Sequence, residues 1–376
     1  MPSTQLRQTI FKSVRQVVVK VGTNSLADDR GHLDLAYLND LARQIAGLVQ
    51  RGLHVVLVSS GAVGAGMAEL DLPGRPRTLP LLQATAAVGQ GQLMRHFYDA
   101  FAARGVKVAQ ILITRGDFED RRRFLNIRNT VTALQKYHVV PIINENDTVA
   151  VDELPGGMRG KFGDNDIIAA HVTNMLRAGL LVVLSVVDGV LKGGKTLELI
   201  QSAAGSSDLS DGSRSKLGSG GMDTKLTAAF MVSRAGEPVV IANARTPDVL
   251  SRLLAGEKLG TLIVPATRKM KSRRRWIAHT AATAGSVLVD GGAAKALLEG
   301  GKSLLASGIT AVAGEFEKGA NIAILSPGGK EIARGLTNYS SDEIRRIKGL
   351  KSSQIAKVLG EKPYDEVVHR NNMTTA

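Results

Sequence analysis

Five polar or glycine-rich clusters stand out in the sequence, because they adjoin segments that are otherwise apolar or helical in pattern. Residues 20–25 read KVGTNS, residues 59–66 SSGAVGAG, residues 144–147 NEND, residues 163–166 GDND and residues 219–225 SGGMDTK. The first three follow short apolar runs typical of buried strands, and the last two open or precede helical patterns. In an open parallel sheet, ligands bind where the strands end. We therefore expect these clusters to meet at one site.

The residue types in these clusters fit the transfer of a phosphoryl group. Lys20 and Lys225 could neutralise charge on the moving group, glycine amides could hold nucleotide phosphates, and carboxylates could place Mg²⁺ or orient a lysine. Such chemistry depends on positioning and charge and needs no covalent nucleophile. The chain has no cysteine and no evident Ser-His-Asp arrangement, which agrees with this interpretation.

Each cluster also has a purely structural interpretation. The glycines of residues 61–66 would suit a tight turn and close helix packing. The acids of residues 163–166 would suit a helix N-cap, and residues 144–147 would suit a loop rich in Asx turns. Lys20 either extends to solvent or is held for an anion. Residues 219–225 lack the GxxxxGK[ST] spacing, so a Walker-type site is not supported.

Strand and helix patterns alternate through the first 262 residues and supply the frame for these clusters. Strands are expected at residues 17–21, 54–58, 106–113, 139–143, 180–187 and 238–242, and helices at 35–49, 81–103, 121–137, 166–176, 224–235 and 247–254. This alternation implies βαβ units and a mainly parallel sheet with helices on both faces. The predicted fold class is therefore α/β, a three-layer αβα sandwich.

The pattern changes beyond residue 262, where short β-like runs and helical stretches are separated by glycine-rich turns. The β-like runs lie at residues 286–289, 309–312 and 322–325, and the helical stretches at 293–299 and 341–347. We predict a first domain at residues 1–265, a basic linker at 266–275, a small α+β or β-barrel-like domain at 276–362 and a loosely ordered tail at 363–376.

Composition and charge limit the class of protein. The 376 residues carry 48 Lys and Arg against 34 Asp and Glu, a net charge of +14, and 44% of them are hydrophobic. This apolar content excludes a disordered chain. No apolar run reaches the length of about 18 residues that crosses a bilayer. The polar N-terminus lacks the apolar core of a secretory signal, so a cytoplasmic protein with no membrane partner is expected.

The positive charge is concentrated towards the C-terminus. Residues 263–376 carry +8 of the net charge, and their densest basic cluster spans residues 268–275. This cluster is either a solvated linker or an attraction for nucleic acid, because Lys and Arg neutralise phosphates. The domain has few aromatic side chains on which bases could stack.

In order along the chain, the motifs resemble those of the amino acid kinase family, and within it the branch that acts on L-glutamate. The segments that carry the resemblance are residues 18–23, 60–66, 144–147, 163–166 and 218–225, with landmarks at 87–90 and 122–126. The NEND and GGMxTK motifs separate this branch from the acetylglutamate, aspartate, carbamate and UMP kinases. From about Trp276 the chain resembles the PUA domain, with similar turns at residues 289–293 and 308–309.

The resemblance implies an enzyme that uses ATP and Mg²⁺ to convert L-glutamate to L-glutamyl 5-phosphate, the entry step of proline synthesis. It also implies inhibition by proline and a homo-oligomer, a dimer or tetramer. The implied catalytic residues are Lys20, Lys225 and Asp166, the last organising the lysines or Mg²⁺, and the glutamate contacts are Ser60, Asp147 and Asn165. The implied ATP contacts are Lys20, Gly22, Ser185, Val186, Ser219, Gly220, Gly221, Met222, Asp223, Thr224 and Lys225.

The chain departs from the family pattern on the adenine side of the nucleotide. Family members commonly have Thr-Asp where this chain has Ser185-Val186, with an acid only at Asp188. A Lys-Gly-Gly-Lys sequence at residues 192–195 replaces the usual stretch that ends in Asp-Pro. Two alternatives stay open: an RNA-binding protein built on the basic C-terminal domain, and a kinase of the same fold that acts on another acid.

Overall fold

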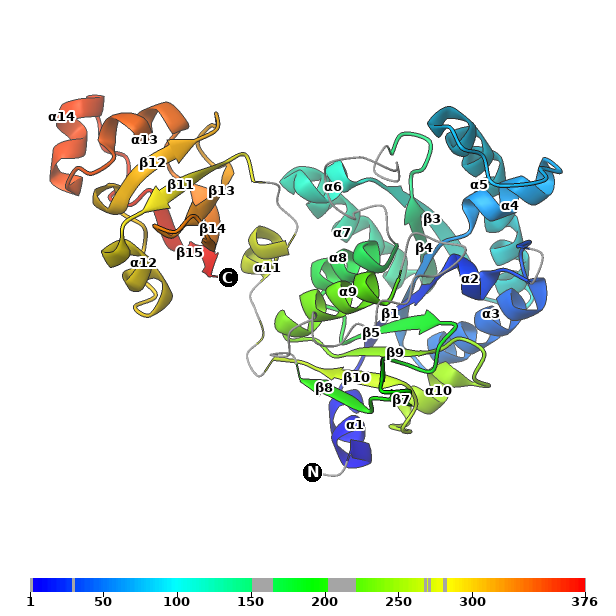
Figure 1. The fold of residues 1–376 in the computed structure, drawn as a ribbon. Coiled ribbons are helices and arrows are strands. Elements are labelled where there is room, and N and C mark those ends of the chain that lie inside the picture. The colour runs from blue at the N-terminus through cyan, green and yellow to red at the C-terminus, as the bar shows by residue number, and fades with distance from the viewer. Residues whose placement is uncertain are drawn as a thin grey trace. The chain divides into compact units, whose positions relative to one another are not determined.

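An eight-stranded sheet forms the centre of the first of the two units into which the chain folds (Figure 1). This computed structural model describes residues 3–28, 31–150, 165–201, 221–266, 269, 272–279 and 283–375. The first unit comprises Met1–Lys269 and the second Met270–Ala376. In the first unit the strand order is β3-β4-β2-β1-β5-β9-β10-β8.

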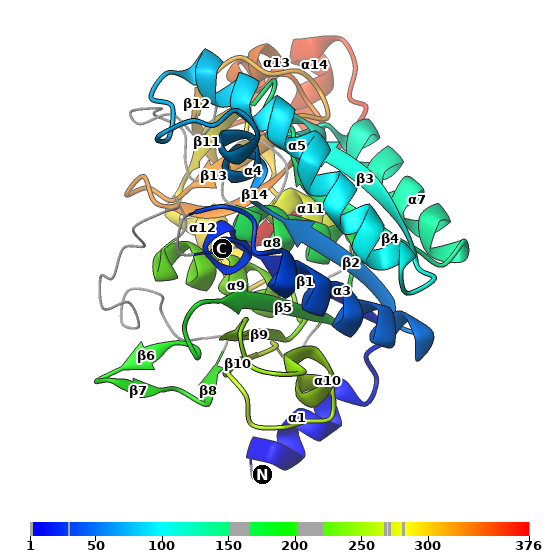
Figure 2. The same ribbon diagram turned by 90° about the vertical axis from the view of Figure 1, so that its right-hand side faces the viewer.

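Six strands of this sheet run parallel to one another, which confirms the mainly parallel prediction. They are β1 (Gln16–Val21), β2 (His54–Ser59), β3 (Lys107–Ile113), β4 (Val139–Glu145), β5 (Leu180–Ser185) and β9 (Val239–Asn243). At one edge β10 (Thr261–Val264) runs antiparallel to β9 and parallel to β8 (Leu199–Gln201). A hairpin of β6 (Leu191–Lys192) and β7 (Lys195–Thr196) extends beside β8 (Figure 2).

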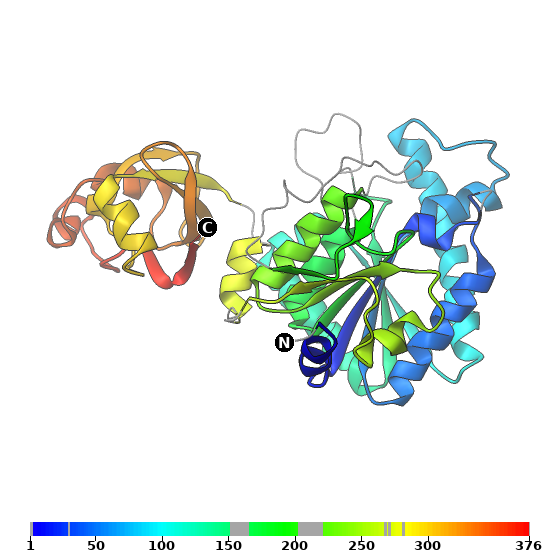
Figure 3. The same ribbon diagram turned by 60° about the horizontal axis from the view of Figure 1, so that its bottom comes forward.

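Helices cover both faces of the sheet and complete the predicted three layers (Figure 3). One face is covered by α3 (Leu35–Gln50), α5 (Leu79–Ala102) and α10 (Val249–Leu254), the other by α7 (Arg121–Lys136), α8 (Asn165–Leu176) and α9 (Met222–Arg234). The shorter helices are α1 (Ser3–Phe11), α2 (Thr23–Leu26), α4 (Ala62–Glu69) and α6 (Arg115–Glu119). In the part of the chain that the structure describes, no helix combines the length and hydropathy needed to cross a membrane.

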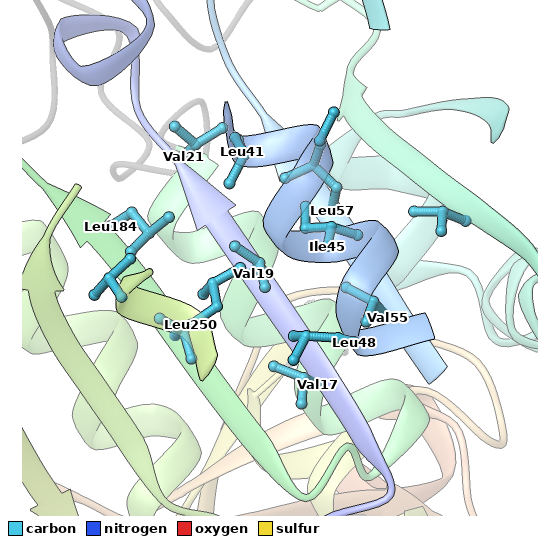
Figure 4. Packing of buried hydrophobic residues seen from close by; sticks show 14 of the residues in the cluster. Val17, Val19, Val21, Leu41, Ile45, Leu48, Val55, Leu57, Leu184 and Leu250 are labelled. Atoms are coloured by element: carbon cyan, nitrogen blue, oxygen red, sulfur yellow. The ribbon is translucent and has the colours of Figure 1, made fainter. Parts of the chain in front are cut away.

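Strand β1 separates the apolar core from the charged site. Val17, Val19 and Val21 pack against α3 and α10, among Leu41, Ile45, Leu48 and Leu250 (Figure 4). Successive side chains of a strand point to opposite faces of its sheet. Lys20 therefore faces the layer that contains α8, while its neighbours fill the core on the other side.

Helix α1 was not among the predicted elements, and a single buried arginine explains why it docks. The guanidinium of Arg7 is fully buried and donates to the backbone oxygens of Glu198 at 3.0 Å, Leu259 at 2.9 Å and Gly260 at 2.9 Å. These partners lie roughly 190 to 250 positions away in sequence. Contacts this far apart in sequence leave no periodic pattern in residues 3–11. The helix therefore forms because of its tertiary contacts and not because of local propensity.

Two glycines allow α4 and α5 to approach closely. A methyl group at Gly66 would overlap the Thr85 carbonyl, and one at Gly89 would overlap the Ala62 carbonyl. Helix α4 begins after Gly61, whose φ of +104° favours glycine. The structural interpretation of Gly61 and Gly66 is therefore correct, and their conformations position the wall of the site described below.

The second unit is built on a five-stranded mixed sheet, which confirms a small β-rich domain. Its strands are β11 (Gly285–Val289), β12 (Ile309–Ala313), β13 (Asn321–Leu325), β14 (Glu331–Thr337) and β15 (Val368–Thr375), in the order β12-β11-β13-β14-β15. Its helices are α11 (Ser272–His279), α12 (Gly291–Leu298), α13 (Ser341–Ile347) and α14 (Ile355–Leu359), with short 3₁₀ turns at Ala306–Gly308 and Ser352–Gln354.

Two predictions for the ends of this unit are wrong. The tail expected to be loosely ordered contains β15, which pairs antiparallel with β14 and places Met373 in the core. The basic segment expected to be a solvated linker contributes to α11, where Arg275 is only 1% exposed and Trp276 is buried. In both cases the charge and weak hydropathy of the segment led to the wrong prediction. Strand pairing orders β15 and packing against a sheet orders α11, and both are long-range contacts that local composition does not show.

We predict that Gly89→Ala destabilises the first unit by about 1–3 kcal/mol, because the added methyl overlaps α4. Gly91→Ala on the same helix is the matched control, since a methyl there meets no atom within 4 Å. Replacing a helical glycine at an open position should stabilise by about 0.5–1 kcal/mol. Urea and thermal unfolding of the two variants measure the difference, and equal stabilities would contradict the close contact.

Candidate active site

A buried carboxylate shared by two lysines forms the centre of the site. Asp166 lies in the first turn of α8 and has no solvent exposure. Lys20 Nζ lies 2.7 Å from its Oδ1, and Lys225 Nζ, from the first turn of α9, lies 3.0 Å from its Oδ2. The structure thus brings the three predicted catalytic residues together. Lys20 is held by an anion and does not extend to solvent.

The charges of these three groups stabilise one another. Burial by itself raises the pKa of Asp166, but the nearby Lys20 and Lys225 outweigh burial and hold that pKa below its ordinary value. Asp166 is therefore ionised at neutral pH. With one negative and two positive groups, the cluster carries a net charge of +1, which suits an anionic ligand such as a phosphoryl group.

Gly22 leaves the space that Lys20 occupies. A Cβ atom at residue 22 would lie 3.1 Å from Lys20 Nζ, tighter than most carbon contacts. Gly22 has φ −89° and precedes α2, so its backbone does not itself demand glycine. The structural reason for a glycine here is thus the room beside the ammonium group.

A small pocket of about 50 Å³ adjoins this cluster and contains all three predicted substrate residues, Ser60, Asp147 and Asn165. Asn165 Nδ2 donates to Ser60 Oγ at 2.8 Å, joining the end of β2 to the start of α8. Because Asn165 directly precedes Asp166, the same helix start connects the pocket to the lysines. The lining also includes Thr23, Gly61, Ala62, Val63, Gly64, Arg75 and Asn144.

Asn144 and Arg75 also line this pocket, and neither was predicted as an individual site residue. Asn144, at the end of β4, is buried and donates to Gln90 Oε1 of α5 at 2.8 Å, while its own Oδ1 accepts from the Glu145 amide at 2.9 Å. Gln90 thereby fixes the orientation of Asn144. Arg75 comes from the connection between α4 and α5, and no spacing in the sequence distinguishes it from the nearby Arg77.

Apart from Lys20 and Gly22, the predicted ATP contacts that the structure describes lie at the start of α9 and at the end of β5. Gly221 precedes α9, and Met222, Asp223 and Thr224 form its first turn with Lys225. Ser185 ends β5 beside β1, and Val186 follows it with 51% of its surface exposed. Ser219, Gly220 and Asp164 lie outside the described residues.

A second pocket of about 310 Å³ opens at the end of β9. Its wall includes Asp188, whose Oδ1 accepts from Asn243 Nδ2 at 2.8 Å. Ser185 and Val186 do not contribute to its lining. Asp188 lies two residues after the position at which family members commonly have an acid. The side-chain amide of Asn243 orients its carboxylate toward β9.

The contacts of Asp166 bear on the two roles that the sequence left open for it. Among residues 3–28, 31–150, 165–201, 221–266, 269, 272–279 and 283–375, no three His, Cys, Asp or Glu side chains are grouped to bind a metal ion. Both oxygens of Asp166 face lysines. Of the two roles that the sequence left open for Asp166, these contacts agree with organising the lysines.

Lysines at strand and helix ends, beside a pocket of polar side chains, define an α/β protein built to bind anions at the carboxyl edge of its sheet. Residues 15–243 match the amino acid kinase family, and residues 285–359 match the PUA domain. A glutamate 5-kinase of Geobacter sp. (strain M21) is 46% identical over 383 residues, covering 98% of this chain and 99% of that protein.

A second relative, a glutamate 5-kinase of Caldanaerobacter subterraneus subsp. tengcongensis, is 45% identical over 368 residues, covering 95% of this chain and 97% of that protein. A solved carbamate kinase from Giardia aligns with a TM-score of 0.48 and 18% identity, over 68% of this chain and 100% of that one, too distant to support a conclusion. The chain belongs to the amino acid kinase family, in its glutamate 5-kinase branch, and carries a PUA domain.

We predict that Asp166→Asn lowers the free energy of unfolding by roughly 3–5 kcal/mol at pH 7, because it removes the buried carboxylate that Lys20 and Lys225 share. The folded-state pKa of Asp166 is depressed, so its stabilisation is complete above the ordinary value of 3.8. The stabilisation is lost as pH falls through the lower folded value.

Urea unfolding of both proteins from pH 3 to pH 8 measures this difference. The gap between wild type and Asp166→Asn should be constant at neutral pH and should narrow at the acid end. Asp99→Asn, at an exposed position on α5, is the control and should change little. A gap that persists unchanged to pH 3 would contradict the charge-based explanation.

Proposed function

We propose that this protein transfers the γ-phosphoryl group of ATP to the side-chain carboxylate of L-glutamate, forming L-glutamyl 5-phosphate and ADP. The observation that carries the proposal is the pair of lysines on buried Asp166, beside a pocket lined by Ser60, Asp147 and Asn165. The name shared by relatives that are 45–46% identical over 95–98% of the chain adds support.

The chemistry needs charge compensation more than acid–base catalysis. A glutamate side chain has an ordinary pKa near 4.3, so its carboxylate is already ionised at neutral pH and has no proton to remove. One of its oxygens attacks the γ-phosphorus, the bond from that phosphorus to the bridging oxygen breaks, and ADP leaves. Lys20 and Lys225 face the negative charge that gathers on the moving group, and Asp166 holds both ammonium groups in place.

The pocket residues suit the other end of glutamate. The carboxylate of Asp147 can bind the substrate ammonium, a charge-assisted interaction. Ser60 and Asn165 hydrogen-bond to each other at 2.8 Å and can turn to the carboxylate that reacts. Because Asn165 and Asp166 are adjacent in α8, a substrate bound at the first lies beside the lysines held by the second.

ATP is expected to bind with its phosphates at the start of α9. Helix α9 has 13 residues, and the amides of its first turn point toward an incoming anion. Mg²⁺ would enter with the nucleotide phosphates, since it keeps several waters and needs few protein carboxylates. On the adenine side, Ser185 and Val186 remain the proposed contacts.

The same proposal includes proline as an inhibitor, a homo-oligomer and a cytoplasmic location. Nucleic-acid binding by the second unit has less support. Several of its basic side chains are paired with acids: Lys318 with Glu343, Arg334 with Glu331, Arg345 with Glu315 and Asp342, and Lys362 with Asp365. Arg275 of the densest basic cluster is buried.

Trapping the acyl phosphate with hydroxylamine tests the function directly. Incubated with ATP, Mg²⁺ and hydroxylamine, the purified protein should form a hydroxamate with L-glutamate and little with L-aspartate or N-acetyl-L-glutamate. Adding proline to the same assay measures the proposed inhibition. Absence of a glutamate hydroxamate would overturn the proposal, and a hydroxamate from another acid would identify a different kinase.

We predict that Lys225→Ala lowers kcat by roughly 100-fold or more while changing the KM for glutamate little, since its charge acts mainly in the transition state. Lys107→Ala, at an exposed position on β3, is the control and should retain wild-type kinetics. Steady-state ADP release at saturating substrates measures both. A Lys225→Ala variant with wild-type kcat would contradict the role assigned to this lysine.

Asp147→Asn should have the opposite kinetic signature. Loss of a charge-assisted hydrogen bond to the substrate ammonium should raise the KM for glutamate by about 10-fold or more. The KM for ATP should be unchanged, because Asp147 lines the pocket proposed for glutamate. Initial rates across a matrix of both substrate concentrations separate the two constants.

A further inference from the structure

We propose that Arg75 binds the α-carboxylate of glutamate and makes the enzyme selective for amino acids in which that carboxylate is free. The proposal rests on the function proposed above and deepens it. Arg75 lies in residues 70–78, which connect α4 to α5, and its side chain lines the same pocket as Ser60, Asp147 and Asn165.

The first argument is the charge inventory of the pocket. Of its described lining residues, Arg75 and Asp147 are charged, and the remaining polar side chains (Thr23, Ser60, Asn144 and Asn165) are neutral. One cation and one anion are the complement of the head group of an α-amino acid, in which an ammonium and a carboxylate share one carbon.

The second argument is the orientation that the reaction imposes on the substrate. The side-chain carboxylate has to reach the lysines on Asp166, and the Ser60–Asn165 pair marks that end of the pocket, because Asn165 adjoins Asp166. The head group then lies at the other end. Asp147 takes the ammonium there, and Arg75, which lines the same pocket, takes the α-carboxylate.

The third argument is that the segments carrying the two charges are connected. Gln83 Nε2, near the start of α5, donates to the Ala150 oxygen at 3.1 Å, and the Ala150 amide donates to the Asn146 oxygen at 2.9 Å. The close contact between α4 and α5 at Gly66 and Gly89 holds the other end of the Arg75 connection. Arg75 is thus carried on a segment anchored on both sides, although its own side chain is exposed.

The chemistry of arginine suits this role. A guanidinium presents two parallel N–H groups in the geometry of a carboxylate. Lysine offers a point charge without the fork, so Arg75→Lys should retain only part of the affinity. Arg77 lies two residues away and is also exposed, but it does not line the pocket, which makes it the matched control.

The experiment compares Arg75→Ala, Arg75→Lys, Arg77→Ala and wild type by ADP release in the full chain. Two compounds are compared as phosphoryl acceptors: L-glutamate, and L-isoglutamine, its α-carboxamide, which keeps the side-chain carboxylate that reacts. Arg75→Ala should raise the KM for glutamate roughly 10- to 100-fold, the value of a charged hydrogen bond, with kcat and the KM for ATP unchanged. The kcat/KM for L-isoglutamine, which is low in the wild type, should not change, because that compound has no α-carboxylate for Arg75 to bind.

Several results would overturn the inference. A wild-type KM in Arg75→Ala would exclude the contact, and a fall in kcat would place Arg75 at the transferring phosphoryl group. Equal losses for glutamate and L-isoglutamine, or the same loss in Arg77→Ala, would indicate a general effect of positive charge. A wild-type enzyme without glutamate-dependent ADP release would instead refute the proposed function itself, so the two failures are distinguishable.

Discussion

The two ion pairs on Asp166 are the constraint on which the rest of the site depends. A fully buried carboxylate is tolerated only with close opposite charges, and here Lys20 and Lys225 supply them from two separate elements. Their geometry requires that β1, α8 and α9 all end or begin at one point. The parallel sheet meets this requirement, because its strands finish at a common edge and each helix starts from there.

The adjacency of Asn165 and Asp166 places the pocket and the ion pairs at one helix start. Asn165 lines the pocket and donates to Ser60, and the next residue, Asp166, pairs with both lysines. In the proposed reaction, lysines held in this way would need little reorganisation as negative charge builds up. Gly22 and the paired glycines Gly66 and Gly89 contribute by being small, since each leaves room that a neighbouring charged or backbone group occupies.

The sequence predicted most of the sheet and the convergence of the site, because buried strands, amphipathic helices and polar strand ends leave local patterns. It could not predict α1, which depends on Arg7 and carbonyls roughly 190 to 250 positions away, or β15, whose partner is β14. It named Asp166 but could not decide what that carboxylate binds. It also had no basis for separating Arg75 from Arg77, because only the folded connection between α4 and α5 brings one of them to the pocket.

The position of β15 has a consequence for the order of folding in the cell. Strand β15 (Val368–Thr375) is the partner of β14 and contributes Met373 to the core of the second unit. The ribosome synthesises β15 after every other described strand of either unit. The first unit can therefore complete its sheet while synthesis continues, whereas the edge of β14 stays unpaired until β15 has left the ribosome.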